Sequence, residues 1–268
     1  MKPRAFDLPY TGRMVNLSLN TSVLRPLLAT VALVLCASAS AQTFQSQAQA
    51  SQVIELFTSE GCSSCPPADR WLSGFKKHPE LFTSVIPLAF HVDYWDYIGW
   101  QDPFANPDYS NRQRRYDRDG GLSSVYTPGF VVNGEEWRRW FSGHHNRPSP
   151  SRKQPGVLQA ELSGNILTAN FASAESLQLN IAYLGMGLSS KVTAGENNHR
   201  QLQHDFVVLE HWQLPAKRSK SGELAWHTEL KPTPDKGQQQ SALVIWLSNK
   251  GEQMPIQATG ILLAEAIK

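Results

Sequence analysis

The sequence contains little cysteine and no excess of charge of either sign. Three of its 268 residues are cysteine, and 25 basic residues accompany 23 acidic ones. Four of the basic residues and one acidic residue lie within residues 1–41, so 21 basic and 22 acidic residues follow this segment. A charge balance this close to neutral argues against nucleic acid or an anionic membrane as the partner.

Long hydrophobic runs are also absent after the first 41 residues, which have the features of a signal peptide. Basic residues precede an apolar run, Leu27 to Leu35, that is too short to span a bilayer, and Ala39 to Ala41 supplies small residues for cleavage. An uncleaved N-terminal anchor is the alternative. No later segment is apolar enough to cross a membrane, so we expect an exported protein, either periplasmic or secreted.

Only two cysteines follow the leader, and both lie in the stretch Val53 to Pro67, VIELFTSEGCSSCPP. This stretch predicts a short buried strand, a turn that carries Cys62 and Cys65, and the start of a helix. A C-x-x-C between a strand and a helix is typical of dithiol chemistry. An oxidising compartment would allow a disulfide to persist. We expect Cys62 to be the attacking thiol and Cys65 to resolve the mixed disulfide.

Neighbouring residues weaken the expected activation of Cys62. Pro66 and Pro67 disfavour helical geometry in the residues before them, so the regular helix is expected to begin at about Pro67. The helix dipole then acts less strongly on Cys62. Glu60, two residues earlier, opposes thiolate formation by like charge if it lies close to the sulfur.

Alternating strands and helices occupy residues 53–146. We expect two buried strands, two helices whose second carries arginines on its exposed side, and a hairpin around an Asn-Gly turn. The expected segments are a strand at Val53–Phe57, a helix from about Pro67 to His78, a strand at Val85–Trp95, a helix at Asp108–Arg118 with Arg112, Arg114, Arg115 and Arg118 exposed, and a hairpin with its turn at Asn133-Gly134 and its return strand at Glu136–Phe141. This order predicts a small α/β sheet of thioredoxin type.

The flanking segments differ in composition. Residues 42–52 are polar and low in complexity, which predicts a disordered lead-in. Residues 147–156 contain three prolines and are expected to be a linker. From residue 157 to 268 apolar residues alternate with polar ones in about seven short runs, which predicts a separate all-β domain of sandwich type.

Two further elements accompany the cysteine pair. Thr127-Pro128 opens the expected hairpin strand, where a proline that is often cis in thioredoxin-like proteins shapes a substrate-binding edge. His91 and Asp93 alternate on a strand, so their side chains are expected on one face, either as a hydrogen-bonded pair or, for His91 with both cysteines, as part of a metal site. A structural role for this His and Asp is the competing interpretation, and His144 and His145 are further candidate ligands.

Four segments of the sequence, in order, resemble one protein family. They are VIELFTSEGCSSCPPAD, HVDYWDYIGWQDPFA, RQRRY, and VYTP with VVNG, and GEN at residues 195–197 is also similar. The family comprises exported thioredoxin-like proteins of unknown function, domain of unknown function 1223. The resemblance implies a thioredoxin-like domain followed by a β-rich region, and it supplies no reaction. This sequence has Gly129 where the family usually has Gln, and prolines interrupt the helix expected after the hairpin.

Three functions are consistent with these residues. The first is an exported thiol–disulfide oxidoreductase without a cofactor, which acts on a protein or small-molecule disulfide or thiol through Cys62, Cys65 and Pro128. The second is a metal chaperone that holds Cu(I) on the two thiolates with His91 as a third ligand. The third is a non-catalytic binding module in which the Cys62–Cys65 disulfide is inert.

Overall fold

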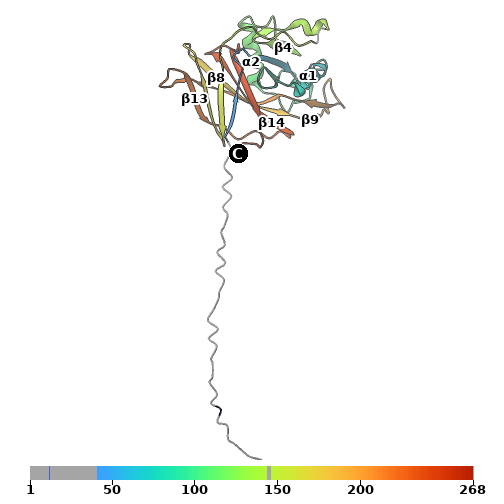
Figure 1. Cartoon of the computed structure of the whole chain (residues 1–268). Helices are drawn as coiled ribbons and strands as arrows, with labels where there is room; N and C mark the ends of the chain where they lie inside the picture. Colours follow the sequence, from blue (N-terminus) through green and yellow to red (C-terminus); the bar gives the residue numbers. More distant parts are fainter. Residues whose placement is uncertain (1–11, 13–40, 144–145, 268) are drawn as a thin grey trace, which may run out of the picture. The chain divides into compact units, whose positions relative to one another are not determined.

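An eight-stranded sheet runs through both halves of the sequence in the computed structural model, which describes residues 12, 41–143 and 146–267 (Figure 1). Its strands lie in the order β15-β14-β8-β11-β3-β2-β4-β5. In chain order they are β2 (Gln52–Thr58), β3 (Val85–His91), β4 (Gly129–Val132), β5 (Glu135–Glu136), β8 (Leu177–Met186), β11 (Val207–Pro215), β14 (Gln240–Asn249) and β15 (Gln257–Leu262). The two halves join where β11 pairs with β3 in parallel, Val207 beside Ala89.

Two smaller sheets complete the β-structure of the described residues. A five-stranded sheet has the order β1-β6-β7-β13-β12, and β9 and β10 form a hairpin of their own. Their strands are β1 (Gln42–Gln45), β6 (Gln159–Ser163), β7 (Ile166–Phe171), β12 (Lys217–Arg218), β13 (Leu224–Glu229), β9 (Leu188–Lys191) and β10 (Gln201–His204).

The described residues contain two α-helices, α1 (Pro66–Ser73) and α2 (Pro107–Arg118). The side chain of Asn106 caps α2 by accepting a hydrogen bond from the Asp108 N–H at 2.9 Å, and Pro107 fits the first turn because its missing N–H would be unpaired there. Helix α1 is followed at once by a 3-10 turn, η1 (Gly74–Lys77). Two further 3-10 segments are η2 (Asp96–Ile98) and η3 (Arg138–Ser142).

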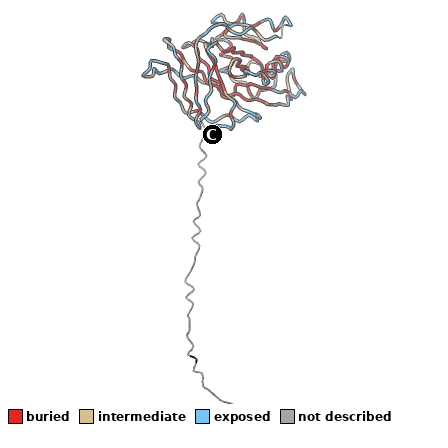
Figure 2. Tube along the Cα trace, viewed as in Figure 1, coloured by how far each residue is buried: buried red, intermediate tan, exposed pale blue. Residues whose placement is uncertain are grey.

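Both faces of the large sheet are covered. Along β8, Leu179 and Ile181 pack into the core shared with β6, β7 and β13, whereas Ala182 and Leu184 point into the core that contains α1 and α2. Figure 1 accordingly shows β13 on one side of β8 and the helices α1 and α2 on the other. The buried colouring in Figure 2 follows these central strands, and the loops that join them are more exposed.

The predicted thioredoxin-type α/β domain followed by a separate all-β domain is wrong. The described chain is mostly β-sheet, and its two α-helices do not flank a sheet of their own. The physical reason lies in β8, β11 and β14. Their alternating pattern indicated strands with one solvent-facing side, yet nine of the ten residues of β8 are buried. These strands extend the sheet of the first half because pairing on β3 satisfies an otherwise open edge.

Several local predictions also need correction. Gln42–Gln45, expected to be disordered, forms β1 and pairs with β6 in antiparallel register. The Asn133-Gly134 turn joins β4 to β5 as predicted, but the return strand has two residues and η3 replaces its continuation. Arg112, expected on the exposed side of α2, is 1% exposed. Residues 147–156, the expected linker, contain no helix or strand.

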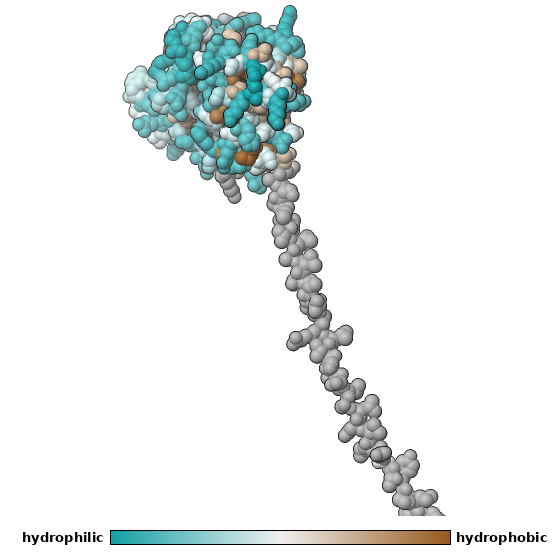
Figure 3. All heavy atoms as spheres, turned by 90° about the vertical axis from the view of Figure 1, so that its left-hand side faces the viewer, coloured by the Kyte–Doolittle hydropathy of each residue, from teal (hydrophilic) through white to brown (hydrophobic). Residues whose placement is uncertain are grey.

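The surface of the described residues is largely polar. Figure 3 shows one face that is mostly hydrophilic with scattered hydrophobic residues. Four large hydrophobic side chains are exposed, and Tyr97 is the most exposed of them at 83%. Among the described residues, no helix is long and apolar enough to cross a membrane. The predicted signal peptide and the pair His144 and His145 lie outside the described residues, apart from Gly12 and Ala41.

Candidate functional site

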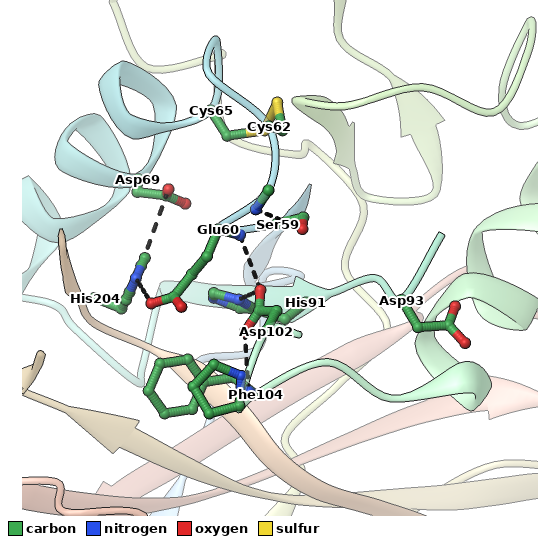
Figure 4. Close-up of polar contacts among 12 residues, drawn as sticks. Ser59, Glu60, Cys62, Cys65, Asp69, His91, Asp93, Asp102, Phe104 and His204 are labelled. Atoms are coloured by element: carbon green, nitrogen blue, oxygen red, sulfur yellow. Dashed lines mark hydrogen bonds and ion pairs between the residues drawn. A yellow bond between two sulfur atoms is a disulfide. The ribbon is translucent and has the colours of Figure 1, made fainter. Parts of the chain in front are cut away.

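A disulfide joins Cys62 to Cys65 immediately before α1 (Figure 4). Both cysteines are fully buried, whereas Ser63 and Ser64 between them are exposed. The backbone folds into a tight turn, since the Cys65 N–H donates to the Cys62 carbonyl at 3.2 Å. The Ser64 Oγ lies 3.3 Å from the Cys62 Sγ. The predicted disulfide pair is therefore formed, with its sulfurs shielded and its intervening backbone at the surface.

The start of α1 offers few free N–H groups to a thiolate. Pro66 and Pro67 occupy the first two helical positions, and proline has no backbone N–H. The next two N–H groups, those of Ala68 and Asp69, both donate to the Cys65 carbonyl. Helix N-termini stabilise anions through unpaired N–H groups and the helix dipole. The helix thus gives Cys62 less anionic stabilisation than a C-x-x-C followed by residues that carry N–H groups.

The tip of the β9–β10 hairpin, residues 192–200, binds the backbone of residues 59–65, which we call the cysteine loop. The Asn197 side-chain amide donates to the carbonyls of Glu60 at 2.8 Å and Cys62 at 3.0 Å. Beside it, a Glu196 carboxylate oxygen accepts from the Ser63 N–H at 3.0 Å. Asn197 is fully buried. We call residues 192–200 the hairpin tip, and it connects the second half of the sequence directly to the disulfide.

Trp95 lies against the cysteine loop and binds the predicted Thr127-Pro128 element. The peptide bond between Thr127 and Pro128 is cis, as the sequence pattern indicated. The Trp95 indole N–H donates to the Thr127 Oγ1 at 2.7 Å. A Cβ added at Gly61 would lie 2.8 Å from the Trp95 Cβ, so the close approach of these segments requires glycine there. Trp95 therefore links the Thr127 side chain to the cysteine loop.

His91 does not pair with Asp93. The His91 Nδ1 lies 2.7 Å from an Asp102 carboxylate oxygen, and that same oxygen accepts from the Glu60 N–H at 2.9 Å. Asp93 instead accepts a hydrogen bond from Ser110. The expectation failed because β3 ends at His91, so the alternation of a strand does not extend to Asp93.

A second buried pair lies beneath the disulfide (Figure 4). Glu60 is fully buried. Its Oε1 lies 2.9 Å from the His204 Nε2, and its Oε2 accepts from the Trp100 indole N–H at 2.8 Å. The other ring nitrogen of His204 is 3.9 Å from Asp69 on α1. We expected Glu60 to oppose a thiolate if it lay close to the sulfur. Its carboxylate instead contacts His204 and Trp100.

The pKa values of this buried cluster shift according to burial and pairing. Burial disfavours the charged form of His91, but the Asp102 carboxylate outweighs it, so the His91 pKa is raised. Burial opposes ionisation of Asp102 in the same way, and the nearby His91 with its hydrogen bond lowers the Asp102 pKa overall. Burial raises the pKa of Asp69, an effect that His204 and His91 reduce.

Stability should depend on pH through the His91–Asp102 pair. A lowered Asp102 pKa contributes stability above its ordinary pKa of 3.8, which is lost as pH falls through the folded value. A raised His91 pKa contributes stability below its ordinary value of 6.5, which is lost as pH rises through the folded value. Urea unfolding should therefore show the stability lost on Asp102→Asn to be greatest between pH 4 and 6.5. A loss that stays constant from pH 5 to 9 would contradict the assignment.

The structure brings together residues that the sequence did not identify. Asp69, Asp102, Glu196, Asn197 and His204 come from α1, two loops and β10. Only the GEN segment gave a sequence signal, through its resemblance to the family. Asp69, Asp102 and His204 are far apart in the sequence and follow no regular spacing, so the sequence does not predict that their side chains lie close together.

The predicted metal site has no matching ligand cluster. No group of three or more histidine, cysteine, aspartate or glutamate side chains is arranged to hold a metal ion among the described residues. His91 directs its Nδ1 to Asp102, and its Nε2 is buried without a hydrogen-bond partner. Cys62 and Cys65 are bonded to each other, so neither is a thiolate ligand in this state.

Comparison with known proteins identifies a family and two similar folds. Protein AGR_C_4864 from Agrobacterium tumefaciens is 22% identical with a TM-score of 0.59, and the match covers 81% of this chain and 96% of that one. HBP35 of Porphyromonas gingivalis is 14% identical with a TM-score of 0.52, covering 82% and 77%. No curated protein sequence matches. The model of the family described as "Protein of unknown function (DUF1223)" matches residues 53–248, and the chain belongs to this family.

Proposed function

We propose that this protein exchanges electrons with a partner through the Cys62–Cys65 disulfide. The observation that supports this most directly is the placement of the bonded pair at the start of α1, with Ser63 and Ser64 exposed between the two cysteines. The ring closed by a three-residue separation is short, so the disulfide restricts the unfolded chain little. Chain entropy alone therefore gives this disulfide a small structural benefit.

The proposed exchange follows the chemistry of thiolate attack. A partner thiolate attacks the Cys62 sulfur and forms a mixed disulfide, and the Cys62–Cys65 bond breaks with its electron pair on Cys65. A second thiol of the partner, as its thiolate, then attacks the partner sulfur of the mixed disulfide and releases Cys62. Two protons pass to Cys62 and Cys65, and the partner leaves oxidised to a disulfide. The reverse sequence oxidises Cys62 and Cys65 and reduces the partner.

The proposed substrates are protein or small-molecule thiols and disulfides, and no cofactor takes part. We further propose export to an oxidising compartment, supported by the basic and apolar pattern of residues 1–41. Pro128 at the cis bond after Thr127 is the proposed substrate-side element, supported by the hydrogen bond from Trp95, which contacts Gly61.

Burial of both sulfurs favours a second candidate, a binding protein with an inert disulfide. In that case the bond contributes to a fixed surface shape and never opens. Reduction potentials separate the two candidates, because structural disulfides typically lie below about −300 mV and exchange-active ones lie higher.

The Cys62→Ser variant should lose nearly all exchange activity. Without the Cys62 thiolate no mixed disulfide forms, so the rate of insulin reduction in a glutathione-coupled assay should fall at least about 100-fold relative to the protein. Cys65→Ser should instead trap a mixed disulfide with the partner, which mass spectrometry detects. Equal, negligible rates for the protein and Cys62→Ser would reject the proposal and favour the inert disulfide.

A further inference from the structure

We propose that the hairpin tip is a lid over the disulfide that decides which thiols reach Cys62. This inference rests on the proposed exchange function for its biological meaning. The lid itself follows from three hydrogen bonds that Asn197 and Glu196 make to the backbone of residues 60–63. Both cysteine side chains are fully buried in this arrangement.

The base of the hairpin is fixed by apolar packing. Leu188 at the start of β9 packs against Phe104 and Val207 in a small core of its own. Next to β10, Asp205 accepts from the Gly187 N–H at 2.9 Å and forms an ion pair with Lys76 at 2.9 Å. These contacts should hold the base of the hairpin in place when the tip moves.

The hairpin tip is attached by the three hydrogen bonds to residues 60–63 and by Gly195, which lies close to Ile98. Of its nine residues, only Val192 and Asn197 are buried. It shares no strand pairing with the two larger sheets, because β9 and β10 pair only with each other. The few buried residues of the tip and the polar character of its contacts favour local opening over global unfolding.

The contact of the tip is directed at the attacked cysteine. Asn197 binds the Cys62 carbonyl, and Glu196 binds the N–H of Ser63, the next residue. Arg200 orients the amide, since its guanidinium donates to the Asn197 Oδ1 at 2.9 Å. A partner thiolate approaches the Cys62 sulfur along the axis of the disulfide bond, and the proposed lid limits this approach by holding the backbone of residues 60–63 in place. Small thiols need a smaller opening than a protein thiol, and the lid accordingly favours small partners.

The test compares the reduction rate of the oxidised protein by dithiothreitol and by reduced, denatured lysozyme. Asn197→Ala removes two hydrogen bonds to the cysteine loop and should raise the dithiothreitol rate about tenfold, with a larger rise for the protein thiol. Glu196→Ala, at an exposed position, should raise both rates by about threefold. Asn198→Ala is the matched control, since Asn198 lies in the same tip and is exposed, and its side chain forms no hydrogen bond with another described residue.

Hydrogen exchange separates lid opening from a general loss of stability. In Asn197→Ala, exchange at Ser63 should accelerate about tenfold while β8 and β14 stay unchanged. Equal reduction rates for the protein and all three variants would overturn the lid, as would equal acceleration of exchange in β14 and at Ser63. Faster reduction of Asn197→Ala without insulin-reducing activity in any form would support the lid and reject the proposed exchange function.

Discussion

Replacing Arg112 by alanine should lower the free energy of unfolding by about 3–5 kcal/mol, because it leaves a buried carboxylate without its partner. The guanidinium donates to both carboxylate oxygens of Glu55, at 2.6 and 2.9 Å, and both side chains are 1% exposed. It also donates to the Gln253 Oε1 at 2.7 Å and lies over the Phe90 ring at 5.1 Å. Urea unfolding measures this loss directly.

Matched variants identify the cause of that loss. Arg114→Ala, at an exposed position of the same helix, should change stability by less than about 0.5 kcal/mol. The double variant Arg112→Met with Glu55→Met should be more stable than Arg112→Ala, because it removes the unpaired charge. A double variant no more stable than the single one would show that packing, and not the charge, accounts for the effect.

Glu60→Ala should destabilise the protein by a similar amount, about 3–5 kcal/mol near pH 6. It removes the carboxylate that binds His204 and leaves the Trp100 indole N–H without its acceptor. Because Glu60 belongs to the cysteine loop and His204 belongs to β10, the loss should also loosen the contact between this loop and the hairpin. Calorimetric unfolding and amide exchange in residues 59–65 measure both effects.

Glu60→Gln provides the comparison for this variant. Glutamine keeps one oxygen that can accept from the Trp100 indole N–H and places an amide N–H toward the His204 Nε2, but it carries no charge. Its loss of stability should therefore be smaller than that of Glu60→Ala. Glu223→Ala, at an exposed position, should be nearly neutral. Equal stabilities for Glu60→Ala and the unmodified protein would show that the buried pair with His204 contributes nothing.

The local patterns of the sequence predicted most individual elements. The apolar run after the leader predicted β2, the Asn-Gly turn predicted the β4–β5 hairpin, and periodicity predicted α2 to within one residue at its start. These elements depend on contacts between near neighbours, which the sequence order displays. The position of Cys62 and Cys65 between a strand and a helix could be predicted for the same reason.

The local patterns of the sequence did not predict which charged and polar residues are buried. Arg112 lies among other arginines on α2, and a charged helix face normally indicates solvent. The ion pair with Glu55, 57 residues earlier, makes burial of both charges tolerable. The same holds for Glu60 and His204, which are 144 residues apart. Their pairing has no signature in composition or spacing.

The sequence by itself determined the cysteine pair, its place before α1, the position of Thr127-Pro128 before a strand and the β-rich character of the second half. Tertiary structure alone decided that β11 pairs with β3, so that one sheet unites the two halves. It also decided that the hairpin tip binds the backbone of the cysteine loop through Asn197. Strand pairing and burial between distant segments depend on total packing and on satisfying every buried polar group, and neither is visible in a local pattern.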